Sequence, residues 1–202
     1  HERQPRAGGL HQVDPDGETS RFLARKLQLI GLYFKQWGLV DEAANMYETG
    51  LRLRPDDAQL RTTYGSLLLS QGYLQQALLQ FTMAYDDNPV NPVINKKLGI
   101  VMLHSENAAR AAYFFKRALS FGGADGDLYL LLGETYVRLG RFPEAKDALR
   151  AALALYDEPT TAHSTREHRH VERTWARTNL HYLEQGAIKD FIPLAHIQGT
   201  TR

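Results

Sequence analysis

The sequence contains no cysteine in its 202 residues. Disulfides, thiolate zinc sites, iron–sulfur clusters and cysteine nucleophiles are therefore excluded, whereas the compartment stays open because many reduced and many exported proteins also lack cysteine. The sequence also lacks a marked excess of positive or negative charge, because it has 24 Lys and Arg and 23 Asp and Glu. A formal net charge of +1 gives no field that would gather nucleic acid or an anionic membrane non-specifically.

Long apolar runs are also missing, because no stretch of the sequence approaches the roughly 20 apolar residues of a membrane-spanning helix. The composition is that of a folded protein, with 43% hydrophobic and 23% charged residues. A chain of this length can bury a core as one or two domains. The sequence begins with His1 rather than Met, so the localisation stays unknown and a missing N-terminal targeting segment remains open.

A repeat of 34 residues runs through most of the chain, in four units that start at residues 24, 58, 92 and 126 and align without insertion. The eighth position of each unit is Gly, the twentieth is Ala and the twenty-fourth is a large apolar residue. These residues are Gly31, Gly65, Gly99 and Gly133; Ala43, Ala77, Ala111 and Ala145; and Tyr47, Phe81, Phe115 and Leu149. Small residues at fixed helical positions let two antiparallel helices approach closely.

These residues resemble the tetratricopeptide repeat, which has Gly at position eight, Ala at twenty and twenty-seven, an aromatic residue at twenty-four and Pro at thirty-two. The resemblance covers residues 24–159. It implies an all-α solenoid, a right-handed superhelix of four helical hairpins over residues 24–57, 58–91, 92–125 and 126–159, in a repeat domain of residues 19–159. Each hairpin cannot bury its apolar face alone, so we expect the units to stack.

Some positions depart from the pattern. Position four carries Arg61 and Asn95 where a large residue is expected, and the third unit has Glu106 where the other units have Gly. We therefore expect the turn "HSENAAR" of that unit to be built differently. Helix starts are predicted after the N-caps Asp57, Asn91 and Asp125, with a proline directly after Asn91.

The flanks of the repeat domain lack its period. Residues 1–18 are rich in Gly, Pro and charge and predict an irregular arm. Residues 160–186 predict a helix that caps unit four, with an apolar stripe of Val171, Trp175, Thr178 and Tyr182. Residues 187–202 form an apolar tail that we expect to dock on this solenoid or on a partner. Its docking residues are Phe191, Ile192, Leu194 and Ile197.

The resemblance further implies that positions two, five, nine and twelve of each first helix face a concave groove. The candidate partner-binding residues there are Gln28, Leu32, Lys35, Thr62, Ser66, Leu69, Lys96, Ile100, Leu103, Leu130, Glu134 and Val137. The residues with which related repeats hold a chaperone's C-terminal carboxylate are absent. The apolar members suit an extended or helical segment with apolar anchors, with Lys96 and Glu134 setting its polar register. The alternative, to which we give equal weight, is that some of these residues pack against neighbouring helices or contact the chain's own tail.

The sequence therefore predicts a non-enzymatic scaffold, without a cofactor, that binds peptide segments or subunits of a multiprotein assembly. Self-association through the tail is an additional hypothesis. Catalysis is disfavoured because "FGGADGD" lacks the Lys and Ser or Thr of a phosphate loop. Ser66 also lacks the second glycine of a nucleophile elbow and lies in a predicted helix.

Two other functions remain as alternatives. A ligand- or metal-binding helix is suggested by His163, His168, His170 and His181, but no two of these residues are three or four apart, as a pair on one helical face would be. An RNA-binding helical repeat is suggested by Arg166, Arg169, Arg173 and Arg177. Glu167 and Glu172 interrupt that basic cluster and make it more typical of a solvated face, so no nucleic-acid partner is expected.

Overall fold

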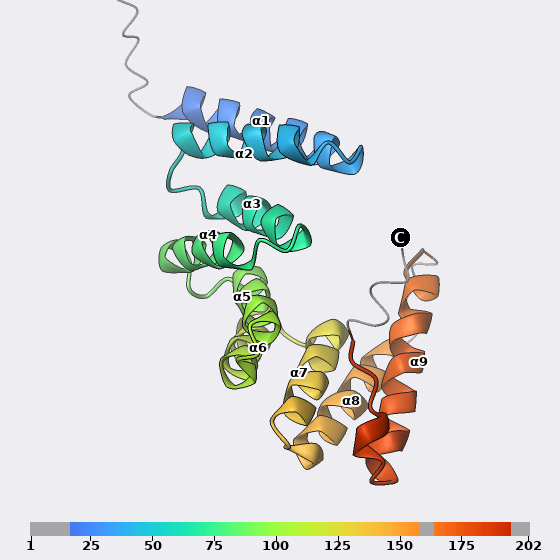
Figure 1. The fold of residues 1–202 in the computed structure, drawn as a ribbon. Coiled ribbons are helices and arrows are strands. Elements are labelled where there is room, and N and C mark those ends of the chain that lie inside the picture. Colours follow the sequence, from blue (N-terminus) through green and yellow to red (C-terminus); the bar gives the residue numbers. More distant parts are fainter. Residues whose placement is uncertain (1–16, 158–163, 195–202) are drawn as a thin grey trace, which may run out of the picture.

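The computed structural model describes residues 17–157 and 164–194. In this part of the chain the fold is all-α, with nine α-helices, one short 3₁₀ helix and no strand (Figure 1). The α-helices are α1 (Glu18–Gln36), α2 (Val40–Leu53), α3 (Ala58–Ser70), α4 (Leu74–Asp87), α5 (Pro92–His104), α6 (Ala108–Gly122), α7 (Gly126–Arg138), α8 (Phe142–Asp157) and α9 (Ser164–Glu184), and the 3₁₀ helix is Ile188–Asp190. None of these helices is both long and apolar enough to cross a bilayer.

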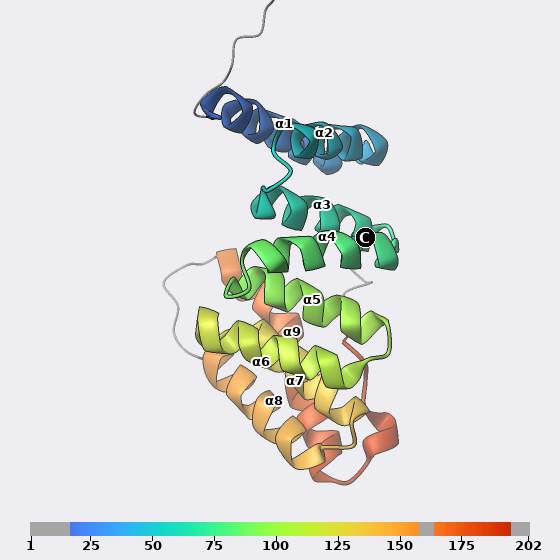
Figure 2. The same ribbon diagram turned by 90° about the vertical axis from the view of Figure 1, so that its left-hand side faces the viewer.

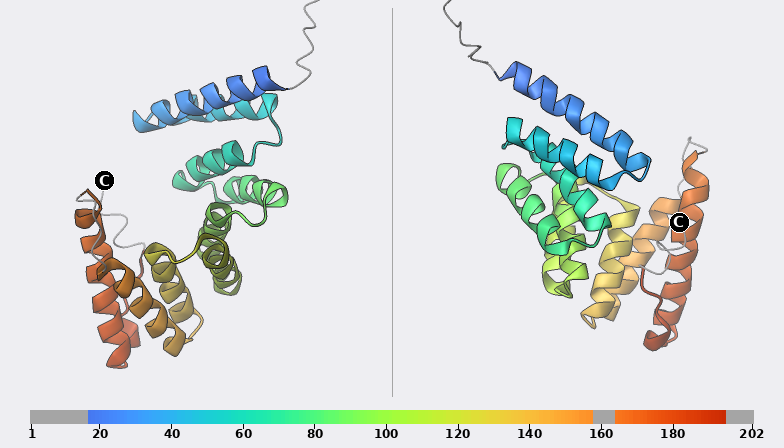
Figure 3. Two further views of the ribbon diagram at one scale, coloured as in Figure 1. Left: turned by 180° about the vertical axis from the view of Figure 1, so that it is seen from behind. Right: turned by 45° about the horizontal axis from the view of Figure 1, so that its top comes forward.

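The helices follow the sequence repeat. The second helices of the four hairpins begin at residues 40, 74, 108 and 142, and the first helices of the last three hairpins begin at 58, 92 and 126. The hairpins stack in chain order into a curved solenoid, with α1 and α9 at opposite ends (Figures 1, 2 and 3). The predicted all-α solenoid is confirmed. The predicted arm lies outside the described residues except at its end, where Glu18 already belongs to α1.

Polar side chains fix the helix starts as predicted. The side chains of Asp57, Asn91 and Asp125 each accept a backbone hydrogen bond of 2.9 Å from the first turn of the following helix. Pro92 occupies the first position of α5, where its missing N–H costs nothing. These three N-caps are therefore confirmed, and they set the repeat boundaries because each satisfies a donor that a helix start leaves unpaired.

Glycine at position eight allows the two helices of each hairpin to touch. A Cβ atom added to Gly65 would lie 2.7 Å from the ring of Phe81, and one added to Gly133 would lie 2.8 Å from a methyl group of Leu149. Phe81 and Leu149 are fully buried, as are the aromatic residues at the same position in the other two units. The repeated Gly therefore makes room for the repeated large residue, which fills the hairpin interior.

The turn of the third unit has the same build as the others, so our expectation of a different turn is wrong. Glu106 has a φ angle of 59°, in the same left-handed region as the glycines that hold this position in the other units. The next N–H, from Asn107, donates to the carbonyl of Met102 at 2.8 Å, as its equivalents do. The Asn107 side chain also caps α6, a contact that the N-caps of α2 and α4 lack. These bonds offset the cost of a left-handed non-glycine residue, roughly 1–2 kcal/mol.

The unusual polar residues at position four hold the connections between units. Arg61 donates to the carbonyl of Pro55 through Nε at 3.0 Å. Asn95 donates to the carbonyl of Pro89 at 3.0 Å and accepts a hydrogen bond from Arg117. Both side chains are buried, at 9% and 0% exposure. Each is therefore paired to the proline carbonyl of the preceding unit, which explains why a polar residue is tolerated there.

α9 packs on α8 at the C-terminal end through Trp175, Ala176 and Leu183. The predicted stripe is correct at Trp175 and wrong at Val171, which is 45% exposed. The buried face is instead formed by Trp175, Ala176, Asn179 and Leu183, and Asn179 is held there by hydrogen bonds to the tail. Two apolar clusters make up the core, one on each side of α5, and partly buried Leu78 and Phe114 pack against both.

Candidate protein-binding groove

The predicted groove residues become more buried from the first unit to the last. On α1, Leu32 is 42% exposed and Lys35 is also exposed. On α7, Leu130 and Glu134 are buried, at 1% and 3% exposure, and Val137 is half-buried. The groove side chains are thus exposed at the N-terminal end and mostly buried at the C-terminal end.

Polar groove residues of the first two units bond within the solenoid. The Thr62 hydroxyl donates to the carbonyl of Ala58 at 2.7 Å, and the Ser66 hydroxyl donates to the Thr62 carbonyl at 2.8 Å. Gln28 on α1 donates to Thr63 on α3 at 2.8 Å and so ties the first helices of adjacent units together. Half-buried Leu69 packs on the N-terminal cluster of the core.

A cavity of about 400 Å³ opens between α5, α7, α9 and the tail. Its lining residues are Lys96, Ile100, Leu103, His104, Glu106, Asp127, Leu130, Leu131, Glu134, Arg138, Glu172 and Leu194. The structure thus brings together five predicted groove residues, namely Lys96, Ile100, Leu103, Leu130 and Glu134. The other seven lie outside the cavity, six of them on α1 and α3 and one, Val137, further along α7.

Lys96 and Glu134, which we predicted to make the polar contacts that position a bound segment, already form ion pairs within the chain. The ammonium group of Lys96 lies 3.1 Å from the carboxylate of Asp125 and 3.8 Å from that of Asp127. Glu134 accepts a hydrogen bond of 2.6 Å from Arg138, one helical turn away. Their charges are therefore largely neutralised inside the solenoid.

The tail forms one wall of this cavity. The carboxamide of Asn179 binds the backbone of Ile192 on both sides, accepting from its N–H at 2.7 Å and donating to its carbonyl at 3.1 Å. Trp175 donates to the same carbonyl at 2.8 Å and meets the ring of Phe191 edge-on. Leu194, at 4% exposure, donates its backbone N–H to Glu134 at 3.0 Å. The tail thus runs beside α9 and reaches α7 (Figure 1).

Of the two docking places that the sequence left open for the tail, the described part occupies the solenoid. Ile197 lies outside the described residues. Asn179, which holds the tail, was missed by our sequence analysis. It lies four residues after Trp175 and so shares its helical face, which was the available signal.

Two side chains near the groove, Tyr156 and Lys97, have shifted pKa values. Burial raises the pKa of Tyr156, and its hydrogen bond of 2.7 Å to Asp127 adds to the shift, as does the charge of Glu172. Burial also lowers the pKa of Lys97, and the charges of Lys96 and Lys35 lower it further. The C-terminal part of the groove therefore holds negative charge around Asp127 and Glu172, whereas positive charge gathers beside Lys97.

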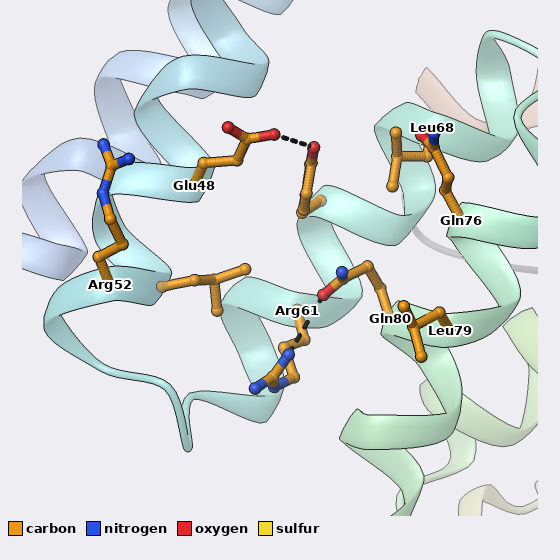
Figure 4. Close-up of a pocket in the computed structure, with 9 residues that line it drawn as sticks. Glu48, Arg52, Arg61, Leu68, Gln76, Leu79 and Gln80 are labelled. Atoms are coloured by element: carbon orange, nitrogen blue, oxygen red, sulfur yellow. Dashed lines mark hydrogen bonds between the residues drawn. The ribbon is translucent and has the colours of Figure 1, made fainter.

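A second hollow, of about 540 Å³, lies between α2, α3 and α4, away from the predicted groove residues (Figure 4). Tyr64 donates to Glu48 across it at 2.5 Å, and Arg61 donates to Gln80 at 3.3 Å. The Tyr64–Glu48 bond joins consecutive units, whereas the Arg61–Gln80 bond lies within the second hairpin. Because the polar side chains across the hollow pair with one another, we assign it a structural role.

The histidines proposed for metal binding are not gathered. His170 and His181 are exposed and eleven residues apart on α9, whereas His163 and the side chain of His168 lie outside what the structure describes. Within the described residues, no group of three or more His, Cys, Asp or Glu side chains could hold a metal ion. Arg173 and Arg177 both pair with Asp157, at 3.2 and 3.1 Å, and so form part of the packing between α8 and α9.

Comparisons with known proteins agree with this fold. Two family models, both described as tetratricopeptide repeat, match residues 30–92 and 102–165, which together make up more than half of the chain. No curated protein matches the sequence significantly.

Several solved structures are similar in fold. A crystal structure of MamA has 18% identity and a TM-score of 0.64 over 79% of this chain and 86% of that one. A second MamA structure has 17% identity and a TM-score of 0.61 over 85% and 97%. YrrB, described as a TPR protein with an unusual peptide-binding site, has 16% identity and a TM-score of 0.62 over 84% and 81%. At these identities the likeness shows the fold alone.

Proposed function

This chain belongs to the tetratricopeptide repeat family, and from that premise we propose that it is a protein-interaction scaffold, without chemistry of its own, whose concave groove binds a peptide segment or a subunit of a larger assembly. One observation carries the proposal: five predicted groove residues, from the first helices of two units, line a single cavity of about 400 Å³. Convergence of predicted positions on one concave site is what a binding groove requires.

The mechanism is preorganisation. The cavity walls belong to helices whose packing fixes them, since Leu103 and Leu130 are buried in the core and Glu134 is held by Arg138 and by the tail. A partner segment therefore bears most of the ordering cost of binding. From the cavity a bound segment can extend past Leu69 toward exposed Leu32, so apolar anchors are available along the open part of the groove.

The proposal can be tested with a random peptide library presented to the full chain. Leu69→Lys and Ile100→Lys each place a charge on the groove side of a first helix. Leu79→Lys makes the same kind of change at a 58% exposed position of α4 and serves as the control. We expect the two groove variants to weaken binding of the selected peptides about tenfold or more, which corresponds to about 1.4 kcal/mol, and the control to bind normally. Equal binding by all the chains, or a library that yields no binder, would contradict the proposal.

Self-association through the tail remains a proposal as well. Phe191 and Ile192 are half-buried on α9, so we test the proposed contact with a second copy at residues 195–202. Deleting those residues leaves the contacts of Phe191, Ile192 and Leu194 in place. If the tail drives assembly, the solution mass should fall on deletion, as measured by light scattering. A full-length chain that is already monomeric would contradict self-association.

A further inference from the structure

We infer that the cavity between α5, α7 and α9 receives the side chain of a lysine or arginine from the bound segment, next to an apolar residue of that segment. The inference rests on the proposed peptide-binding role of the groove and assigns the chemistry of its ligand. Three features carry it: the charge balance of the lining, one buried carboxylate oxygen, and the apolar walls.

The lining has more carboxylates than cations. Its four carboxylates are Glu106, Asp127, Glu134 and Glu172, its two permanent cations are Lys96 and Arg138, and His104 is its one other titratable residue. Both cations already form ion pairs within the chain. Lys96 pairs with Asp125 and Asp127, and Arg138 pairs with Glu134. Arg138 also donates to the carbonyl of Leu103 at 3.2 Å. An acidic ligand would therefore meet no free cation here, whereas a basic ligand would meet uncompensated negative charge.

Glu172 is the residue that points to a specific ligand. Its Oε2 atom is buried and has no hydrogen-bond partner among the described residues. A buried acceptor without a donor is costly, by roughly 1–3 kcal/mol and more for a charged group. Glu172 lies on α9, opposite the first helices that carry the predicted groove residues, and it lines the cavity with them. An ammonium or guanidinium group in the cavity would place the opposite charge beside this uncompensated carboxylate.

The apolar walls suit the rest of such a side chain. Ile100, Leu103 and Leu130 form the walls on the first helices, and Leu194 of the tail faces them from the α9 side. Lysine and arginine lay their methylene stems along apolar surface while the charged head reaches a polar group. Half-buried Leu69 on α3, the first helix of the unit next to α5, is the groove residue that an apolar neighbour in the segment would contact.

The test compares peptides selected from a random library on three full-length chains: wild type, Glu172→Gln, and Glu184→Gln as the matched control. Glu184 is an acidic residue of the same helix that is paired with Arg150 at 2.8 Å outside the cavity. We expect peptides selected on wild type and on the Glu184→Gln chain to be enriched in Lys or Arg beside an apolar residue. Their affinity for the Glu172→Gln chain should fall about tenfold, that is, by about 1.4 kcal/mol.

A double-mutant cycle then assigns the contact. Replacing the basic residue of a selected peptide by norleucine should weaken binding to wild type but cause little further loss with the Glu172→Gln chain. Peptides that bind without basic enrichment, or that bind the Glu172→Gln chain unchanged, would overturn the inference and leave the proposed function standing. A library that yields no binder on any chain would overturn both.

Discussion

Trp37 and Trp175, the two tryptophans of the chain, lie near opposite ends of the solenoid and in opposite environments. Trp37 follows α1 and is 70% exposed, whereas Trp175 on α9 is 3% exposed. The C-terminal unit is covered by α9 and the tail, which do not belong to the repeat. Within residues 17–157 and 164–194, no comparable element covers the outer face of α1.

Equivalent repeat positions show the same difference. At position ten, Tyr33 of the first unit is 60% exposed, whereas its three equivalents in the later units are at most 1% exposed. At position seven, Ile30 is 43% exposed and its equivalents are 3–9% exposed. Among the buried equivalents, Tyr64 lies against Tyr47 of the preceding hairpin, with 6.1 Å between the ring centroids. The burial of positions seven and ten is therefore set by the neighbouring unit, as expected for a one-dimensional stack.

The largest expected effect separates the two tryptophans. Trp175→Ala removes a buried indole, its hydrogen bond to Ile192 and its contact with Phe191, so we expect the free energy of unfolding to fall by about 3–5 kcal/mol. Trp37→Ala should change it by no more than about 0.5 kcal/mol, as at other exposed positions. Urea denaturation measures both. Similar losses in the two variants would show that the N-terminal end is covered in solution.

Fluorescence provides an independent check on the same comparison. In the Trp37→Ala chain the remaining Trp175 should emit at short wavelength and resist quenching by iodide. In the Trp175→Ala chain the remaining Trp37 should emit at longer wavelength and be quenched readily. Protection of Trp37 from iodide would contradict its exposed position.

A smaller effect is expected from filling the glycine of position eight at two places. Alanine at Gly99 would overlap the ring of Phe115, and alanine at Gly31 would overlap the ring of Tyr47. We expect Gly99→Ala to cost about 1–3 kcal/mol through overpacking. Gly31→Ala should cost less, because α1 has no preceding hairpin among the described residues and can shift outward. Thermal unfolding of the pair measures this difference, and an equal cost would mean that the end unit is as confined as an interior one.

The repeat period explains how much of this fold could be predicted. Glycine, alanine and aromatic residues at fixed intervals predicted the all-α solenoid, and the N-caps Asp57, Asn91 and Asp125 were correct because capping is local. The turn at Glu106 was predicted incorrectly, since backbone hydrogen bonds outweigh a local preference for glycine there. Pattern reasoning cannot weigh a local cost against bonds that form only in the folded hairpin.

The candidate site was predictable only in part. Family positions brought Lys96, Ile100 and Glu134 to one cavity, but nothing local showed that Lys96 and Glu134 would be paired within the chain. Asn179 and Glu172 were missed because they lie beyond the repeat, and their roles depend on where α9 and the tail pack. Long-range placement of a non-repeat segment is set by tertiary contacts that no single-sequence period encodes.

The turn at position fifteen allows a modest stabilisation in the middle of the solenoid. Glu106→Gly relieves a left-handed non-glycine conformation, and we expect the free energy of unfolding to rise by about 0.5–1 kcal/mol once the greater freedom of glycine in the unfolded chain is counted. The reverse change, Gly72→Ala, should lower it by about 1 kcal/mol or more, because Gly72 has a φ angle of 80°. Urea denaturation tests both, and a loss of stability in Glu106→Gly would show that the Glu106 side chain makes a contact that outweighs the strain.

The smallest expected change in stability concerns position six of the repeat. At this position an apolar residue is exposed in one unit and a charged residue is half-buried in another. Leu29 at the N-terminal end is 47% exposed, whereas Lys97 inside the solenoid is half-buried. Burial lowers the pKa of Lys97, with Lys96 and Lys35 adding to the shift, so its charged form destabilises the folded state. At pH 7 we expect Lys97→Met to raise the free energy of unfolding by no more than about 1 kcal/mol, and Leu29→Lys to change it by less than about 0.5 kcal/mol.

The pH dependence gives the sign of this last effect. A lowered lysine pKa means that the unfolded chain binds more protons than the folded chain, so wild-type stability gains from Lys97 as the pH rises toward the ordinary pKa of 10.5. The advantage of Lys97→Met over wild type should therefore narrow with rising pH, because the folded wild type then carries Lys97 neutral. Measuring the difference between the two chains cancels other groups that titrate in this range, such as Tyr64, whose pKa burial raises. If the difference in unfolding free energy between the two chains widens with pH, the ammonium group of Lys97 is stabilised in the folded protein. Interior and end positions of the solenoid would then not differ in the way proposed at position six.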